Sequence, residues 1–256
     1  MSVSGPASLV WLSPPLSLTL IRNEVHVWLV RADKAGLCSV CCAELLTSAE
    51  RERAARFKFE KDRRLYTVAH AALRSLLAGY LNVAPGGLEF ESGRRGKPRL
   101  APTLTKDKLE FNLSHSHEVA LIAVTREREI GVDVERVTED FAFAEVAERY
   151  FTAGEVSALR ALPQDLQRRA FYQCWTSKEA FLKARGVGLS GELDEVEIVL
   201  AGEGRVQVKS TIAQWSLREL NPCAGDVGAV VLEGQEFDLK CFSWPGPAQG
   251  SSHSHP

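Results

Sequence analysis

The stretch from residue 119 to residue 137 reads VALIAVTREREIGVDVERV, and two segments within it have the pattern of β-strands. Val119 to Thr125 is apolar and rich in β-branched residues, and Ile130 to Val137 alternates apolar with polar residues. The charged segment between them, Arg126 to Glu129, is typical of a turn. We therefore predict a β-hairpin, in which these two strands pair with each other.

The second of these strands carries two carboxylates. Asp133 and Glu135 are two residues apart, and side chains two apart on a strand leave the same face, with Val132 and Val134 on the other. Adjacent carboxylates repel each other unless a positive charge lies between them, and Mg²⁺ prefers oxygen ligands of this kind. The alternative is a solvated strand face on which Glu135 pairs with a nearby arginine.

A helix is predicted further along, where Phe171 to Lys183 reads FYQCWTSKEAFLK. Glu179 and Lys183 are four residues apart and therefore share a face of this helix. They fit an ordinary exposed ion pair, which contributes little to stability. They also fit a third carboxylate for a metal ion beside a lysine for a phosphate.

Polar and basic residues precede the two strands. Asn112 to Ser116 reads NLSHS, in which the amide and hydroxyl groups can donate to phosphate oxygens and His115 can carry a positive charge. The segment from Gly93 to Pro98 reads GRRGKP, a basic loop with free backbone N–H groups. Each feature has a plain alternative, a structural histidine in the first case and a solvated loop in the second.

The remaining periodicity predicts an α+β protein of the α/β sandwich type. Further strands are expected at Glu24 to Arg31, Leu88 to Glu91, Glu195 to Leu200, Arg205 to Lys209, Trp215 to Leu220, Gly228 to Leu232 and Phe237 to Ser243. Helices are expected from Thr47 to about Phe57, Asp62 to Leu81, Phe141 to Tyr150, Thr152 to before Pro163, and Leu166 to Ala184. Capping boxes open two of them, at Thr47 to Glu50 and Thr152 to Glu155. The elements form two similar sets, which suggests two halves of similar size.

Composition argues against several classes of protein. Lys plus Arg total 31 and Asp plus Glu 33, so there is no basic excess for nucleic acid. The apolar run from Leu9 to Ile21 contains Pro14 and Pro15 and lacks a basic start, which makes it a poor signal peptide or membrane span. We expect a soluble, cytoplasmic protein. The group Cys38, Cys41 and Cys42 has no second pair to complete a zinc site, so we expect reduced thiols.

In chain order the motifs are a basic helix, GKP, NLSHS, GVDVE and WTSKEAFLK. This ordered set resembles the Sfp-type 4'-phosphopantetheinyl transferases over roughly Thr47 to Leu189. The resemblance implies two pseudo-symmetric halves with coenzyme A between them. Residues 1–126 would carry the basic helix, GKP and NLSHS, residues 127–245 would carry GVDVE and WTSKEAFLK, and residues 246–256 would form a disordered tail.

The resemblance also implies the reaction and its residues. Phosphopantetheine would move from coenzyme A to a serine of an apo acyl or peptidyl carrier protein, with release of 3',5'-ADP. The residues that match magnesium ligands are Asp133, Glu135 and Glu179. The expected catalytic set is Glu179 as base, with Lys183 and His115 on the pyrophosphate. The expected coenzyme A contacts are Arg53, Arg64, Lys97, Pro98, Ser114, His115 and Lys183.

Two residues depart from the family pattern: Glu50 lies where some relatives have a second basic residue, and His117 follows NLSHS where a small or acidic residue is more usual. Arg51 or Arg64 could substitute for the second basic residue at the 3'-phosphate. The resemblance implies a monomer that serves fatty-acid, polyketide or nonribosomal-peptide carriers, with neither nucleic acid nor membrane as partner. Two other functions stay open from the sequence. One is a non-catalytic protein that binds coenzyme A and carriers, and the other is a magnesium-dependent phosphohydrolase.

Overall fold

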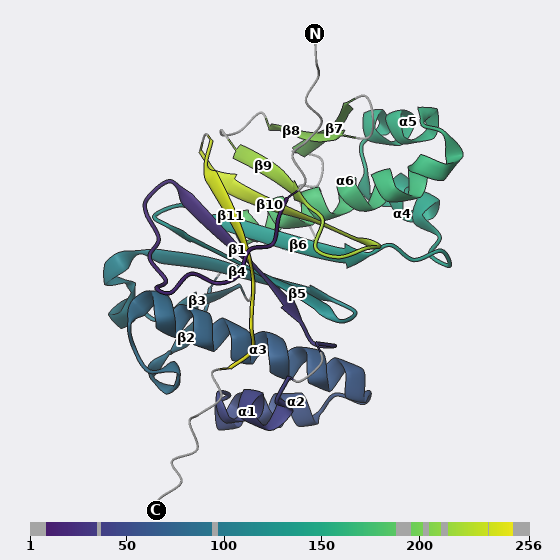
Figure 1. The fold of residues 1–256 in the computed structure, drawn as a ribbon. Helices are drawn as coiled ribbons and strands as arrows, with labels where there is room; N and C mark the ends of the chain where they lie inside the picture. Colours follow the sequence, from purple (N-terminus) through teal and green to yellow (C-terminus); the bar gives the residue numbers. More distant parts are fainter. Residues whose placement is uncertain are drawn as a thin grey trace, which may run out of the picture.

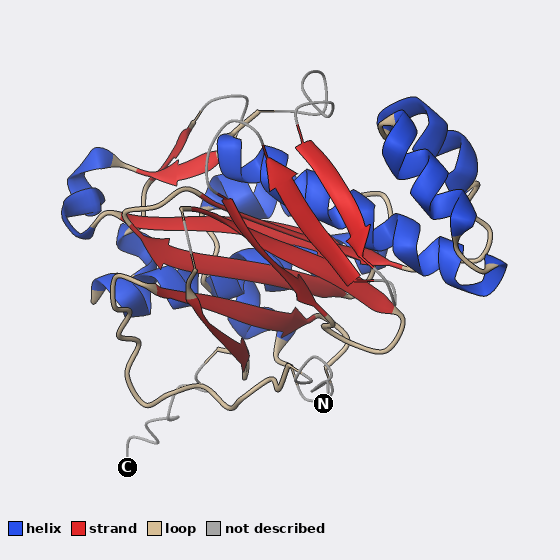
Figure 2. Cartoon of the chain, turned by 90° about the horizontal axis from the view of Figure 1, so that it is seen from above, coloured by secondary structure: helices blue, strands red, loops and turns tan. Residues whose placement is uncertain are grey.

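A computed structural model describes residues 9–34, 37–93, 97–187, 196–201, 205–210, 215–234 and 236–247. Within these residues the chain is an α+β protein, as the sequence predicts, with strands in the centre and helices outside them (Figures 1 and 2). The predicted disordered tail falls almost entirely outside the described residues.

The first layer of strands is a four-stranded sheet in the order β11-β1-β5-β4. Its strands are β1 (Glu24–Arg31), β4 (Leu109–Ser116), β5 (Val119–Arg126) and β11 (Asp238–Ser243). The long helix α3 (Glu60–Leu81) covers one face of this sheet, with α1 (Ser39–Glu44) and α2 (Ser48–Ala55) beside it (Figure 1). Smaller elements complete this half: 3₁₀ turns at Pro85–Gly87 and Pro102–Asp107, and the paired strands β2 (Phe90–Ser92) and β3 (Pro98–Leu100).

The second layer is a three-stranded antiparallel sheet in the order β6-β10-β9. Its strands are β6 (Ile130–Arg136), β9 (Trp215–Leu220) and β10 (Asp226–Glu233). The helix α6 (Gln164–Arg185) packs on it, next to α4 (Phe143–Tyr150) and α5 (Ala153–Ala161). The strands β7 (Val196–Ala201) and β8 (Arg205–Ser210) pair with each other.

The two sheets pack face to face, so the protein has four layers: helix, sheet, sheet and helix (Figure 1). Strand periodicity explains this arrangement, because alternate residues of one strand face opposite layers. In β5, Leu121 and Ala123 face the second sheet, while Ile122 and Val124 face α3. In β6, Val132 lies between the sheets, and the residues on either side of it face α6.

The predicted pairing of the hairpin is wrong. Both strands form, but β5 pairs with β1 and β4, whereas β6 pairs with β10 in the other sheet. Because β5 already has a neighbour on each edge, it has no free edge for β6. The charged segment between β5 and β6 therefore connects two sheets rather than closing a hairpin.

Two segments that carry sequence motifs form strands that the prediction missed. NLSHS lies in β4, and the Lys97-Pro98 motif leads directly into β3. A signal for β4 was present, because the apolar residues Leu109, Phe111 and Leu113 alternate with polar ones at the period of a strand. The short helix α1 was missed as well.

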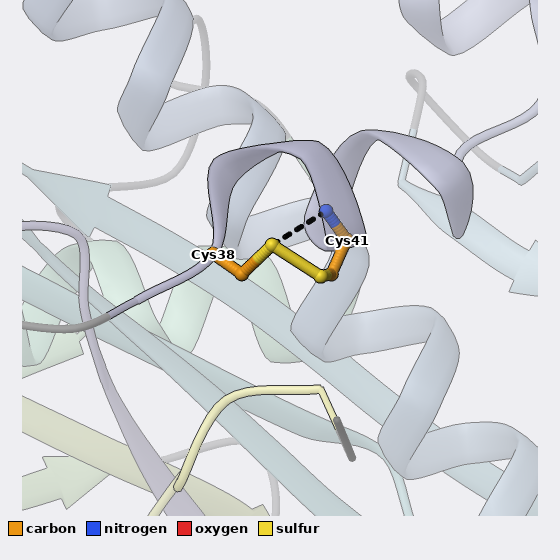
Figure 3. The surroundings of a disulfide bond; sticks show 2 residues. All are labelled: Cys38 and Cys41. Atoms are coloured by element: carbon orange, nitrogen blue, oxygen red, sulfur yellow. Dashed lines mark hydrogen bonds between the residues drawn. A yellow bond between two sulfur atoms is a disulfide. The ribbon is translucent and has the colours of Figure 1, made fainter. Parts of the chain in front are cut away.

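The cysteines also differ from expectation. Cys38 and Cys41 form a disulfide at the start of α1, where reduced thiols were expected (Figure 3). Cys38 lies just before the first turn of the helix, so the three-residue spacing brings the two side chains together. Cys42, Cys174 and Cys241 are free and buried, and Cys223 is free and half-buried.

The described helices give no sign of a bilayer span. None of them combines the length and the apolar character that crossing a membrane would require.

Candidate active site between the two sheets

The position of α6 on β6 depends on Gly131. A Cβ atom at this residue would lie 1.9 Å from the carbonyl oxygen of Ala180 and 2.4 Å from the backbone nitrogen of Ala184. Only a residue without a side chain allows the helix backbone to lie this close to the strand. Asp133 is two residues further along the same face of β6, and this packing brings it to Lys183 of α6.

Asp133, Ser114 and Lys183 form one hydrogen-bonded cluster. The Lys183 ammonium donates to Asp133 Oδ1 at 2.6 Å and to Ser114 Oγ at 2.9 Å. Ser114 Oγ donates to the same Asp133 oxygen at 2.7 Å. The other carboxylate oxygen, Oδ2, is buried and has no hydrogen-bond partner in the part of the chain that the structure describes. Three of the predicted site residues are therefore brought together, from β4, β6 and α6.

Two further side chains of β4 reach β6. Asn112 Oδ1 accepts from the backbone N–H of Val132 at 2.9 Å. Ser116 Oγ donates to Glu135 Oε2 at 2.9 Å and accepts from the backbone N–H of Arg136 at 3.2 Å. We call the line of contact between Asn112, Ser114 and Ser116 of β4 and residues 132–136 of β6 the seam. The sequence predicted Asn112 and Ser116 only as possible phosphate donors within NLSHS and did not reveal their contacts with β6.

Glu179 and Glu135 are held in an electrostatically unfavourable place. Burial and the neighbouring Asp133 carboxylate, with a smaller contribution from Glu135, raise the pKa of Glu179 to about 7, and Lys183 opposes this shift. Burial and Asp133 likewise raise the pKa of Glu135, which the hydrogen bond from Ser116 counteracts. Like charges in a half-buried site shift pKa values in this direction.

The donor set at the seam fits a divalent cation, although the cluster is not a finished metal site. Within the described ranges, no three His, Cys, Asp or Glu side chains are already gathered closely enough to hold a metal ion. However, Asp133 has a buried oxygen without a partner, and Glu135 and Glu179 add carboxylates whose ionisation is suppressed. A hard cation would satisfy that oxygen and relieve the repulsion.

His115 and Arg53 lie on the α3 side of this cluster. His115 is exposed, yet partial desolvation and the nearby Lys183 and His70 cations lower its pKa. His70 stacks on Tyr66 with ring centroids 4.0 Å apart, and the Arg53 guanidinium lies 5.6 Å from the centroid of the Tyr66 ring. Arg53, Tyr66 and His70 thus contact one another in turn, and His70 acts on His115 electrostatically.

Lys97 lies at the other end of β6. Its ammonium donates to Glu129 Oε2 and to the carbonyl oxygen of Ile130, both at 3.0 Å, and to the carbonyl oxygen of Ala184 at 3.2 Å. Its side chain is 7% exposed, and burial lowers its pKa. Lys97 therefore ties β6 to the end of α6, one residue from Lys183. Pro98 follows it as the exposed first residue of β3.

Arg64 is not brought to the cluster. It precedes Tyr66 by two residues, which places it roughly 200° around α3. Its charge acts instead on Asp33 and Cys42. Arg51 donates to the carbonyl oxygen of Leu46.

Two acidic side chains have partners that the sequence did not reveal. Glu50 is paired with Arg74 at 2.7 Å, and this pair, together with His70 and the N-terminus of α2, lowers the pKa of Glu50 to about 2 despite its burial. Glu155 pairs with Lys178 at 2.9 Å, each side chain being 1% exposed. Glu155 Oε1 also accepts from the backbone N–H of Ile198, so this pair joins α5, α6 and β7.

A cavity adjoins the far end of the seam. It has a volume of about 540 Å³ and lies between β1, α3, the β4–β5 turn and the β9–β10 loop. Its wall includes His117 and Arg136, the chain neighbours of Ser116 and Glu135. The cavity therefore reaches the end of the seam at Arg136.

Comparisons with known proteins match both halves of the chain. A family model described as the 4'-phosphopantetheinyl transferase superfamily matches residues 129–231, and one described as 4'-phosphopantetheinyl transferase, N-terminal, matches residues 39–127. The 4'-phosphopantetheinyl transferase HetI of a Nostoc species is 40% identical over 234 residues, which cover 91% of this chain and 98% of the relative.

Two more distant relatives match a smaller share of the chain. The 4'-phosphopantetheinyl transferase Sfp of Bacillus subtilis is 30% identical over 64% of this chain and 70% of its own length. The human L-aminoadipate-semialdehyde dehydrogenase-phosphopantetheinyl transferase is 30% identical over 59% of this chain and 52% of its own length. All three relatives are named as transferases, and none of these names supports a non-catalytic binding protein.

Proposed function

Since the chain belongs to the 4'-phosphopantetheinyl transferase superfamily, we propose that its reaction takes place at the seam, with a magnesium ion held by Asp133, Glu135 and Glu179. The protein is a 4'-phosphopantetheinyl transferase. It moves phosphopantetheine from coenzyme A to a serine of an apo carrier protein and releases 3',5'-ADP.

The observation that carries the metal proposal is the Asp133 carboxylate. One of its oxygens accepts from Ser114 and Lys183, and the other is buried without a partner among the described residues. Two more carboxylates with raised pKa values adjoin it. A buried excess of negative charge on oxygen atoms favours a hard divalent cation. When bound, magnesium would supply positive charge for the negative charge that builds on the pyrophosphate.

The side chains around this site suit the remaining steps. Lys183 and His115 would hold phosphate oxygens of coenzyme A, because the Lys183 ammonium and an imidazole N–H of His115 can both donate hydrogen bonds. The serine hydroxyl of the carrier forms a bond to the β-phosphorus, and the bond to the bridging oxygen breaks as 3',5'-ADP leaves. Glu179 would accept the hydroxyl proton, because it lies beside Asp133 in the proposed site and a positioned carboxylate can act as a general base.

The coenzyme A contacts are proposed from both halves. Ser114 belongs to the hydrogen-bonded cluster with Asp133 and Lys183. Arg53 contacts Tyr66, which stacks on His70. Lys97 and Pro98 would border the nucleotide at the opposite end of β6, next to Ala184. The role of Arg64 stays a prediction from the family resemblance.

We also propose that one chain is sufficient for activity. The seam takes its polar groups from β4, β6 and α6 of a single copy, which supports a monomer. The net charge of -2 supports neither nucleic acid nor an anionic membrane surface as a partner. Coenzyme A is an intracellular substrate, which supports the cytoplasm as the location.

Intact-mass spectrometry of carrier proteins tests the transfer and ranks the carriers. Apo carriers from fatty-acid, polyketide and nonribosomal-peptide synthesis would be incubated with coenzyme A, magnesium and this protein. A gain of one phosphopantetheine arm on at least one of them is expected, and the relative rates identify the pathway served.

Other outcomes would favour the rival functions. Release of free phosphopantetheine without any loaded carrier would indicate a phosphohydrolase. Binding of coenzyme A with neither transfer nor hydrolysis would indicate a non-catalytic binding protein.

A further inference from the structure

Side chains, rather than a shared sheet, join β4 and β6 at the seam. The two strands belong to different sheets, and each is an edge strand of its own sheet. Asn112 bonds the backbone N–H of Val132, and Ser116 bonds that of Arg136. Both pairs are 20 residues apart in sequence, so the two strands run in the same direction with a fixed register. Polar side chains of β4 thus accept hydrogen bonds from the backbone N–H groups of β6, as backbone carbonyl groups do between strands of one sheet.

Ser116 differs from Asn112 because it also contacts a carboxylate. One hydroxyl accepts from the Arg136 N–H at 3.2 Å and donates to Glu135 Oε2 at 2.9 Å. It therefore ties the Glu135 side chain to the backbone of the residue that follows it. Glu135 is the penultimate residue of β6 and is only half-buried. If the hydrogen bond from Ser116 is lost, the three side-chain torsions of Glu135 allow it many conformations.

We propose that Ser116 is a positioning residue, whose hydroxyl fixes the Glu135 carboxylate at the seam and thereby sets the affinity of the cation site. This inference rests on the proposed function, because it takes Glu135 as a cation ligand. Hydrogen-bond partners of metal ligands act in this way by fixing ligand orientation before the metal binds.

Direct titration with Mn²⁺, followed by electron paramagnetic resonance at saturating coenzyme A, tests the inference without relying on turnover. Ser116→Val and Ser116→Thr form a matched pair, since they have the same shape and differ only in the hydroxyl. Removing a partner of a metal ligand lowers metal affinity about 10- to 100-fold. We therefore expect Ser116→Val to bind Mn²⁺ at least about tenfold more weakly than the wild type. Ser116→Thr should stay close to the wild type.

Thr125→Val is the control for loss of a buried hydroxyl elsewhere. Thr125 Oγ1 donates to the carbonyl oxygen of Glu24 at 3.0 Å, in the sheet that contains β4 but away from the seam. Its Mn²⁺ affinity should not change. If Thr125→Val weakened Mn²⁺ binding as much as Ser116→Val, the effect would be a general loss of stability and the inference would be wrong. Ser116→Ala replaces the valine variant if the latter does not fold.

Asp133→Asn separates failure of the inference from failure of the proposed function. If Asp133→Asn loses Mn²⁺ binding but Ser116→Val keeps wild-type affinity, Ser116 does not position the site, and the metal assignment stands. If Asp133→Asn also binds Mn²⁺ as the wild type does, the metal assignment fails and the inference fails with it.

Discussion

Asp133 uses one carboxylate oxygen within the protein and leaves the other without a partner among the described residues. Lys183 and Ser114 both donate to Oδ1, which fixes the direction of the carboxylate. The arrangement is the one expected of a ligand that is oriented before its metal arrives. At the scale of single residues, the proposed metal site therefore depends on Asp133 and on Glu179 beside it.

Neutral variants of these two carboxylates should lose transfer but keep the fold. Asp133→Asn retains an oxygen that can accept from Ser114 and Lys183, and Glu179→Gln keeps the size of its side chain. We expect the rate of carrier loading to fall on the order of 10²- to 10³-fold, the usual loss when one electrostatic contact to a transition state is removed. Loading rates and melting temperatures would be measured together. Wild-type turnover in either variant would mean that the metal site is wrongly assigned.

Lys97 has a structural role that the family resemblance did not reveal. Lys97→Met removes a hydrogen-bond donor from the carbonyl oxygens of Ile130 and Ala184 and from Glu129 Oε2, while Arg99 still donates to Glu129 Oε1. We expect the free energy of unfolding to fall by about 1–3 kcal/mol, as for other buried polar groups that lose a partner. The KM for coenzyme A should also rise, because Ala184 adjoins Lys183.

Urea denaturation and coenzyme A kinetics distinguish the two roles of Lys97. Loss of stability with an unchanged KM would remove Lys97 from the coenzyme A site. A higher KM at unchanged stability would contradict the structural role.

At the scale of elements, the close approach of α6 to β6 sets the geometry of the site. Gly131→Ala places a methyl group within 1.9 Å of the Ala180 carbonyl oxygen, so the helix must move away from the strand. Overpacking of this kind destabilises a protein by about 1–3 kcal/mol or more. Because Glu179 and Lys183 move with the helix, we expect carrier loading to fall further than the loss of stability explains.

Gly86→Ala is a matched control for this substitution. A Cβ at Gly86 meets no atom within 4 Å, and the residue lies in a short 3₁₀ turn away from the seam. Loading rate and unfolding free energy should both stay close to the wild type. If Gly131→Ala behaved like Gly86→Ala, the contact between β6 and α6 could not control the site.

The elements themselves were largely predictable from local pattern, whereas their partners were not. Period two predicted β5, β6 and the shared face of Asp133 and Glu135, and the capping boxes at Thr47 and Thr152 are confirmed. The hairpin failed because strand pairing depends on which edges distant segments already occupy. The ion pair between Lys178 of α6 and Glu155 was equally unpredictable, since the two residues are 23 positions apart and belong to different helices.

At the scale of the whole molecule, a buried histidine links the first sheet to α3. His26 Nδ1 lies 2.6 Å from the hydroxyl of Tyr80, which also accepts from Trp28 Nε1 at 2.9 Å. Burial lowers the pKa of His26 to about 4, against the opposing effect of Glu24. In the folded chain, His26 therefore stays neutral at pH values where the same side chain of the unfolded chain is protonated, that is, below about pH 6.5, the usual pKa of histidine. Because the unfolded state alone gains this proton, the free energy of unfolding is unaffected by His26 above pH 6.5 and falls as the pH drops from 6.5 towards 4.

We expect this effect of His26 to lower the free energy of unfolding by about 2 kcal/mol between pH 7.5 and pH 5. The measurement is urea denaturation as a function of pH in a Glu179→Gln background, because Glu179 binds its proton near pH 7 in the folded state and would oppose the effect. Adding His26→Gln should remove this pH dependence. The same pH dependence with His26→Gln would show that another group is responsible.

The four-layer arrangement brings the proposed catalytic groups from both halves of one chain to the seam between the two sheets. At this seam we propose that magnesium binds and that the transfer takes place. The most direct test is the mass of an apo carrier protein after incubation with coenzyme A and the protein, either with magnesium or with EDTA. We expect a gain of one phosphopantetheine arm with magnesium, no gain with EDTA, and loading by Asp133→Asn that is slower by about 10²- to 10³-fold with magnesium. Equal loading with magnesium and with EDTA would contradict the account.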